Sequence, residues 1–193
     1  MKIKNKTKWL VYTALKTALT AVATIVVRVP SLDNGATNLS DAIIFMTAIL
    51  MDPIAAMLAG GIGAFLGDLL AGGSTTMLYS FAIHGVEGLV VGLLMKLLPR
   101  KEGKAQYALE VVYMLIGGII MVTGYFFAKA FGYGTLESAI PSLWRNMIQA
   151  ATSIVVAMLL VYPLKLKRLV DRSELYGEIN EDTAKYEPES VKK

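Results

Sequence analysis

Two groups of polar side chains stand at helical spacing inside stretches that are otherwise apolar. His84 and Glu87 are three residues apart, and Arg145 and Asn146 precede Gln149 by four and three residues. Side chains at these separations face the same side of a helix. A carboxylate accepts hydrogen bonds from amino groups, imidazole and amides both donate and accept, and a guanidinium clasps a carboxylate. Both groups therefore have the chemistry to recognise a small polar molecule.

The composition indicates that these side chains are positioned by membrane helices. The chain has 193 residues, of which 55% are hydrophobic and 18% charged, and its mean hydropathy is +0.55. Soluble domains have about 45–50% apolar and about 25% charged residues. The absence of cysteine excludes disulfides and thiolate chemistry. At 20.9 kDa the chain is too short to carry its own motor domain, so any energy from ATP must come from another polypeptide.

Six apolar runs approach the length of about 20 helical residues that a bilayer requires. The expected fold is all-α: an integral membrane bundle of six transmembrane helices within residues 1–170, followed by a flexible acidic cytoplasmic tail at 171–193. The second run is short and ends at Asp52-Pro53, which predicts a tight break between two antiparallel helices. The runs are 10–29, 37–51, 54–71, 76–98, 107–130 and 139–163.

The basic residues predict the orientation of the bundle. Most of them fall on one side of the membrane, whereas only Arg28 and Lys129 lie near span ends on the other. The positive-inside rule then places both termini in the cytoplasm. The expected location is a bacterial-type cell membrane, which the chain crosses several times. The residues on the basic side are Lys2, Lys4, Lys6, Lys8, Lys96, Arg100, Lys101, Lys104, Lys165, Lys167 and Arg168.

This orientation places the intramembrane polar groups in the outer half of the bundle. Ionisable side chains inside a membrane usually face a cavity or a partner. Aromatic residues accompany these groups, and a pocket with aromatic walls and a few directed polar groups is typical of a small-molecule site. The predicted substrate-binding residues are Asn38, Asp41, Tyr79, His84, Glu87, Tyr125, Trp144, Arg145, Asn146 and Gln149.

Several of these residues also have structural interpretations. Glu87 and Arg145 can neutralise one another between helices, Asp41 can cap the second helix, and Trp144 can anchor the membrane interface. His84 is the one histidine in the chain. Because a metal site needs several ligands, we expect no metal ion. The convergence of the whole set at one depth favours ligand binding.

Small residues at helical spacing form a second pattern. Ala14 and Ala18, in the first run, have the separation that lets helix backbones approach closely in lipid. Similar spacing in the runs 54–71 and 76–98 predicts packing within the bundle. Because Ala14 and Ala18 lie near the cytoplasmic end of their run, they can dock another protein. The alternative is that they pack inside the bundle.

The motifs together resemble the substrate-binding S components of energy-coupling factor (ECF) vitamin transporters. The resemblance covers roughly residues 8–168 and rests on Ala14-x-x-x-Ala18, Asn38-Leu-Ser-Asp41-Ala, Ala59-Gly-Gly-Ile-Gly63, Gly67-Asp68-Leu-Leu and His84-Gly-Val-Glu87-Gly. It implies a membrane receptor that captures a vitamin from outside and associates with a transmembrane scaffold subunit and two cytoplasmic ATPases. It further implies that Ala14 and Ala18 contact the scaffold. The ligand would lie among the last three spans, beneath the loop that joins the first two.

The chemistry of the predicted site favours a small aromatic substrate such as pyridoxine or hydroxymethylpyrimidine. Arg145 equally suits the carboxylate of pantothenate or niacin, and riboflavin is also open. The chain has no phosphate-binding Gly-rich loop, so ATP is expected to be used by the partner subunits, and this chain is expected to have no cofactor.

Two other classes of function are weaker alternatives. A membrane-embedded hydrolase using Glu87 and His84 lacks Gly-x-Ser-x-Gly and His-Glu-x-x-His motifs, and we expect no enzyme. A self-contained secondary transporter often carries inverted repeats, and the two halves of this sequence show none.

Overall fold

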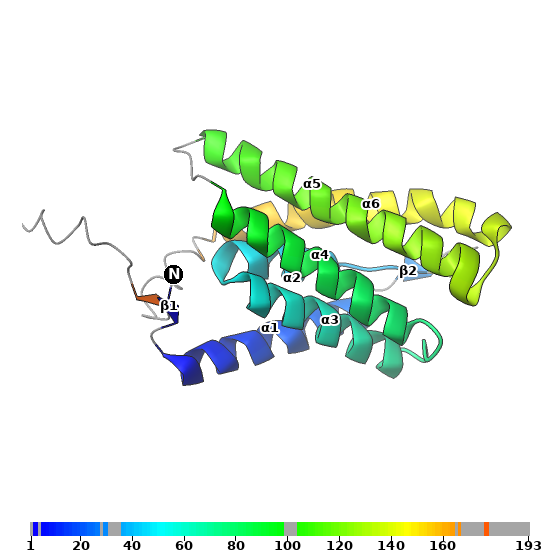
Figure 1. Ribbon diagram of the computed structural model, residues 1–193, viewed down its shortest axis with the longest axis horizontal. Helices are drawn as coiled ribbons and strands as arrows, with labels where there is room; N and C mark the ends of the chain where they lie inside the picture. Colours follow the sequence, from blue (N-terminus) through cyan, green and yellow to red (C-terminus); the bar gives the residue numbers. More distant parts are fainter. Residues whose placement is uncertain are drawn as a thin grey trace, which may run out of the picture.

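The computed structural model describes residues 2–3, 5–27, 29–30, 36–98, 104–164, 166 and 176–177. Its helices lie side by side along the long axis of the molecule (Figure 1). A π-helical segment, η1, continues the fifth helix. The elements are α1 Lys6–Val26, α2 Ser40–Leu50, α3 Pro53–Leu70, α4 Met77–Leu97, α5 Lys104–Phe127, η1 Ala128–Tyr133 and α6 Leu136–Val161. Apart from strands of two residues each, the described fold is all-α.

The short helix α2 forms the core of the bundle. Apart from Ile43, all of its residues are buried, because α1, α3, α4 and α6 all pack against it. Phe45 and Ile44 are fully buried. At about 1.5 Å per residue, the 11 residues of α2 extend only about half of the ~30 Å hydrocarbon core.

Five helices, counting α5 and η1 as one, are long and apolar enough to cross a membrane within the described part of the chain. The helix in the second apolar run, α2, is shorter than such a span. The all-α fold is therefore confirmed, with five candidate membrane spans, while the count of six spans and the orientation stay predictions. Arg28 and, except for 176–177, the predicted acidic tail at 171–193 lie outside the described residues.

The turn between α2 and α3 forms at Asp52-Pro53, as the sequence predicts. The side chain of Asp52 accepts hydrogen bonds from the backbone N–H groups of Ile54 and Ala55, at 2.9 and 3.1 Å. These bonds satisfy amides that have no partner within the helix, and Pro53 has no N–H to satisfy. The indole of Trp9 also donates to Asp52, which ties α1 to this turn.

Glycines let α3 lie directly against α1 and α4. A Cβ atom on Gly63 would stand 2.5 Å from the Cβ of Thr20, and one on Gly67 would stand 2.5 Å from the Cβ of Thr24. On the other face, Gly60 lies against the backbone of α4 at His84. The small residues of the predicted third and fourth runs therefore pack within the bundle, as expected.

Short strands lie at both ends of the bundle (Figure 1). After α1, β2 Val29–Pro30 pairs antiparallel with β3 Ala36–Thr37. At the other end, β1 Lys2–Ile3 pairs antiparallel with β4 Tyr176–Gly177. The second pairing brings segments from near both ends of the chain side by side.

The close contact between α1 and α3 predicts the effect of filling it. We expect Gly63→Ala to lower the melting temperature of the detergent-solubilised protein, with a cost of about 1–3 kcal/mol from overpacking. Gly85→Ala is the matched control, because its added Cβ would meet the nearest atom, the Cα of Gly61, at an ordinary 3.7 Å. Equal losses of stability in the two variants would contradict the prediction.

Candidate ligand-binding site

A cavity of about 430 Å³ lies at the end of the bundle that carries β3 and the turn between α3 and α4. Its wall combines residues of α1, α3, α5, η1 and α6 with β3 and that turn. Asn38, two residues before α2, also lines it. Because α2 does not extend to this end of the bundle, its N-terminus lies beneath the cavity.

The structure brings half of the predicted substrate-binding residues to the wall, namely Asn38, Tyr125, Arg145, Asn146 and Gln149. Two aromatic residues lie elsewhere. The ring of Tyr79 packs against the ring of Tyr133, a wall residue, with 5.2 Å between centroids. The side chain of Trp144 is 69% exposed on the outer surface of α6, a position that suits an interfacial anchor.

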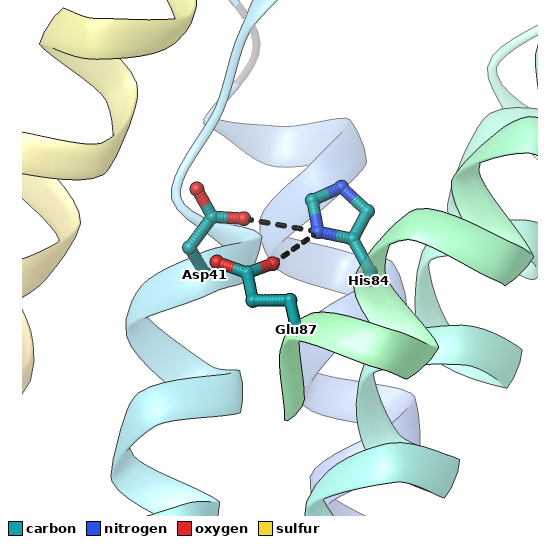
Figure 2. Close-up of side chains that lie close together, drawn as sticks. All are labelled: Asp41, His84 and Glu87. Carbon is teal, nitrogen blue, oxygen red and sulfur yellow. Dashed lines mark hydrogen bonds and ion pairs between the residues drawn. The ribbon is translucent and has the colours of Figure 1, made fainter. Parts of the chain in front are cut away.

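The other three predicted residues form a buried cluster beneath the wall, the floor triad of Asp41, His84 and Glu87. Figure 2 shows the carboxylates of Asp41 and Glu87 pointing toward the ring of His84. The Nδ1 atom of His84 lies 2.8 Å from Oε2 of Glu87 and 3.3 Å from Oδ1 of Asp41. All three residues are at most 2% exposed. Asp41 and Glu87 therefore contact His84, rather than capping α2 and pairing with Arg145, respectively.

A chain of hydrogen bonds connects the floor triad to the wall. The Nε2 atom of His84 lies 3.1 Å from the hydroxyl of Tyr125, which lies 2.6 Å from the hydroxyl of Ser80. Ser80 and Thr76 donate to Oδ2 of Asp68 at 2.6 and 2.8 Å. The chain holds the phenol ring of Tyr125 in place, so the triad positions a wall residue.

Gln149 makes the second connection between floor and wall. Its Nε2 donates to Oδ2 of Asp41 at 3.0 Å, and its Oε1 accepts from the backbone N–H of Asn38 at 3.0 Å. Asn38 in turn accepts, through Oδ1, from the N–H of Ser40 at the start of α2. One amide therefore links α6, the floor triad and the segment that follows β3.

Sequence reasoning missed further wall residues that carry charge. Asp68 and Lys129 were recognisable only as outer charges within spans, which alone marks a cavity or a partner. The π-helical η1 carries Lys129, and such segments are frequent at functional sites. Thr75 and Ser138 belong to polar loops whose composition suits segments that fold over a ligand, but no pattern placed them or Thr76 on a cavity wall. The wall also includes Thr24, Ala36, Tyr133 and Gly134.

The wall offers both donors and acceptors to a bound molecule. The amide Nδ2 of Asn146 is buried and has no hydrogen-bond partner among the described residues. A buried donor without a partner costs about 1–3 kcal/mol, so a ligand acceptor at this position would gain that amount. The cavity wall also carries charges of both signs. The negative charge is the carboxylate of Asp68, and the positive charges are the side chains of Lys129 and Arg145.

The other end of the bundle also holds a buried carboxylate, Glu110 of α5, which is 2% exposed. It accepts hydrogen bonds from the amide of Gln106, at 2.8 Å, and from the hydroxyl of Tyr162. Glu110 thus joins α5 to the end of α6, far along α5 from the cavity.

The chain matches known proteins over most of its length. The model of the family described as ECF-type riboflavin transporter, S component, matches residues 4–166. A protein of Pyrococcus woesei, described as an uncharacterized protein in the gap 3′ region, is 32% identical over 145 residues, 75% of this chain and 93% of the relative. The thiamine precursor transporter HmpT of Lactococcus lactis subsp. cremoris (strain MG1363) is 32% identical over 158 residues, 82% of this chain and 86% of the relative.

The family match covers the entire helical bundle, including the cavity and the floor triad. It also includes Ala14 and Ala18, which form the alanine face of α1. The apolar helices agree with a protein embedded in a membrane. As its motifs predict, the chain belongs to the ECF-type riboflavin transporter S component family and is a multi-pass membrane transport protein.

Proposed function

We propose that this chain captures a small vitamin or vitamin precursor from outside the cell and delivers it for ATP-driven uptake. The observation that carries the proposal is the polar cavity at one end of an apolar bundle. In this role the chain works with an ECF scaffold subunit and two ATPases, which use the ATP, and capture of the vitamin itself requires no cofactor. Both termini are proposed to face the cytoplasm, opposite the cavity.

The favoured substrates are hydroxymethylpyrimidine and pyridoxine. A cavity of about 430 Å³ falls within the ordinary range for small ligands. Asp68 can accept from an amino group, while the amides of Asn146 and Gln149 can bond hydroxyl groups and ring nitrogens. The phenol rings of Tyr125 and Tyr133 offer flat faces for a heterocycle. The name of the relative HmpT, a thiamine precursor transporter, supports the pyrimidine.

An acidic substrate is the alternative within the same function. Arg145 and Lys129 lie on the cavity wall, and both can bind the carboxylate of pantothenate or niacin. The description of the matching family keeps riboflavin as a third candidate.

Binding is favoured over catalysis by the position of the acid–base residues. His84 and Glu87, the pair that a hydrolase would use, lie beneath the cavity rather than on its wall. General acid–base catalysis requires hydrogen-bond reach to the reacting group. A self-contained secondary transporter is the remaining alternative, and it would transport substrate in liposomes that contain no ATPase.

The alanine face of α1 supports the proposed contact with the scaffold. Ala14 and Ala18 are exposed on α1, whereas Thr13 and Thr20 are buried against the bundle. Exposed small residues let another helix approach closely in lipid.

The segment around β3 is proposed to close over the ligand. Asn38 lines the cavity and its N–H is held by Gln149, another wall residue. A ligand that contacts either residue therefore also contacts the hydrogen bond that joins Asn38 to α6.

The proposed function predicts that the chain alone has affinity for a vitamin or vitamin precursor. Purified protein without ATPases is expected to bind one compound from a panel of hydroxymethylpyrimidine, pyridoxine, pantothenate, niacin and riboflavin, measured by calorimetry. Asn146→Ala is expected to weaken binding about tenfold or more, because a buried hydrogen bond is lost. Ile148→Ala, 61% exposed on the same helix, is the control and keeps the affinity. Failure of every compound to bind would overturn the proposed function.

The hydrogen bond between Gln149 and Asn38 predicts how strongly residues 36–40 are held. We expect Gln149→Leu to speed amide hydrogen exchange at residues 36–40 by about fivefold, since one hydrogen bond is worth about 1 kcal/mol. Gln106→Leu removes the bond to Glu110 at the other end and leaves this exchange unchanged. Unchanged exchange in Gln149→Leu would show that the bond does not hold the loop.

The third prediction concerns the scaffold. Ala14→Trp and Ala18→Trp are expected to abolish uptake in cells that express the whole transporter, while vitamin binding by the purified chain stays intact. Val155→Trp, at an exposed position of α6, is the control for bulk at the lipid surface. Loss of binding in the alanine variants would assign the two residues to folding instead.

A further inference from the structure

The floor triad has a feature that capture of a vitamin does not explain. Asp41 and Glu87 bring two carboxylates to the same atom, Nδ1 of His84. None of the three residues lines the cavity. Buried carboxylates inside a membrane are costly unless a positive charge compensates them.

The hydrogen bonds around Tyr125 establish which nitrogen of His84 carries a proton. Asp68 accepts from the hydroxyl of Ser80, so Ser80 has no second hydrogen to donate. Tyr125 must then donate to Ser80, and its oxygen must accept from Nε2–H of His84. In neutral His84, Nδ1 is consequently an unprotonated lone pair.

That lone pair points at two carboxylate oxygens. An unprotonated Nδ1 of His84 cannot lie 2.8 Å from Oε2 of Glu87 and 3.3 Å from Oδ1 of Asp41 without a positive centre among these three electron-rich atoms. The centre is either a proton or a metal cation. A single proton leaves one negative charge uncompensated, whereas a divalent cation balances both carboxylates.

We propose that Asp41, His84 and Glu87 bind a divalent transition-metal ion of the Zn²⁺ type, which joins α2 to α4 beneath the cavity. The ligands are one imidazole nitrogen and two carboxylates, a set that suits Zn²⁺ and, less strongly, Mn²⁺ or Co²⁺. The expectation of no metal ion was based on a single histidine, and the contact of Asp41 with His84 supplies a further ligand beside it. The ion neutralises the floor triad. The site is independent of which vitamin the cavity takes.

The spacing of the ligand atoms fits such an ion. For tetrahedral Zn²⁺ with bonds of about 2.0–2.1 Å, neighbouring ligand atoms stand about 3.3 Å apart. The distances from Nδ1 are 2.8 and 3.3 Å, and one ligand atom from each residue lies within 4.8 Å of the others. Small rotations of the carboxylates therefore suffice to surround an ion.

A second observation points to a missing ligand interaction. The Oε1 atom of Glu87 is buried and has no hydrogen-bond partner among the described residues. Polar atoms of this kind are rare in protein interiors because each costs about 1–3 kcal/mol. A metal ion gives this oxygen a partner by bidentate or switched coordination.

The surroundings hold the ligands as metal sites require. A metal-binding histidine usually donates its other ring N–H to a fixed acceptor, which sets the tautomer. Tyr125 serves His84 in this way. The amide of Gln149 donates to the second oxygen of Asp41. Oδ1 accepts only a long bond, at 3.4 Å, from the hydroxyl of Ser40 and keeps a lone pair for the ion.

Metal analysis of the full chain in detergent tests the proposal. After chelator treatment and dialysis, the protein is loaded with Zn²⁺, Mn²⁺ or Co²⁺, desalted and measured by mass spectrometry. We expect one Zn²⁺ per wild-type chain, and at least tenfold weaker binding in Glu87→Gln and Asp41→Asn. Glu110→Gln, which alters a buried carboxylate at the other end of the bundle, keeps the metal.

Further readouts separate the site from folding defects and from surface binding. Zn²⁺ should raise the melting temperature of the wild type and of Glu110→Gln but not of Glu87→Gln, and Co²⁺ should give visible bands that Tyr125→Phe alters. Wild-type protein that retains no more metal than Glu87→Gln would overturn the proposal and leave a triad held by protons. That result would leave vitamin binding, measured separately, unaffected.

Discussion

The length of α2 is the constraint on which the rest of the structure depends. With 11 residues it fills the centre of the bundle for only part of the bundle's length. The surrounding helices continue beyond its N-terminus, and the space they enclose is the cavity. A helix of full span in this place would fill the site with apolar side chains. The turn at Asp52-Pro53 fixes the other end of α2, so the cavity cannot be lost by sliding the helix along the bundle.

Polar groups above α2 are arranged in two layers with different tasks. The wall layer, with Asp68, Lys129 and Arg145, presents its groups to the cavity. The floor triad is sealed from it. Among the residues that the structure describes, Tyr125 and Gln149 belong to the wall and also bond the triad. Since these bonds lie in a region of low dielectric, where each lost hydrogen bond is costly, the floor fixes the orientation of two wall side chains.

Much of this arrangement follows from local sequence. The spacing of His84 and Glu87 placed both on one face, and the small residues of α3 and α4 marked the faces that pack together. The sequence could not supply the rotation of each helix, and Trp144 consequently faces outward although its neighbour Arg145 lines the cavity. Nor could it place Asp41 against His84, because that contact depends on where α2 begins relative to α4. The π-helical turn that carries Lys129 likewise has no periodic signal.

The contact between Asp41 and Gln149 gives the floor an influence on Asn38, which lines the cavity. Gln149 uses its donor on Asp41 and its acceptor on Asn38, so its orientation is fixed by both ends. If the carboxylate of Asp41 lost its charge, it would accept more weakly, and the amide would be freer to turn. A cation held in the triad maintains that charge while removing its electrostatic cost. The compensation of two buried carboxylates and the position of Asn38 on the cavity wall are therefore linked through one amide side chain.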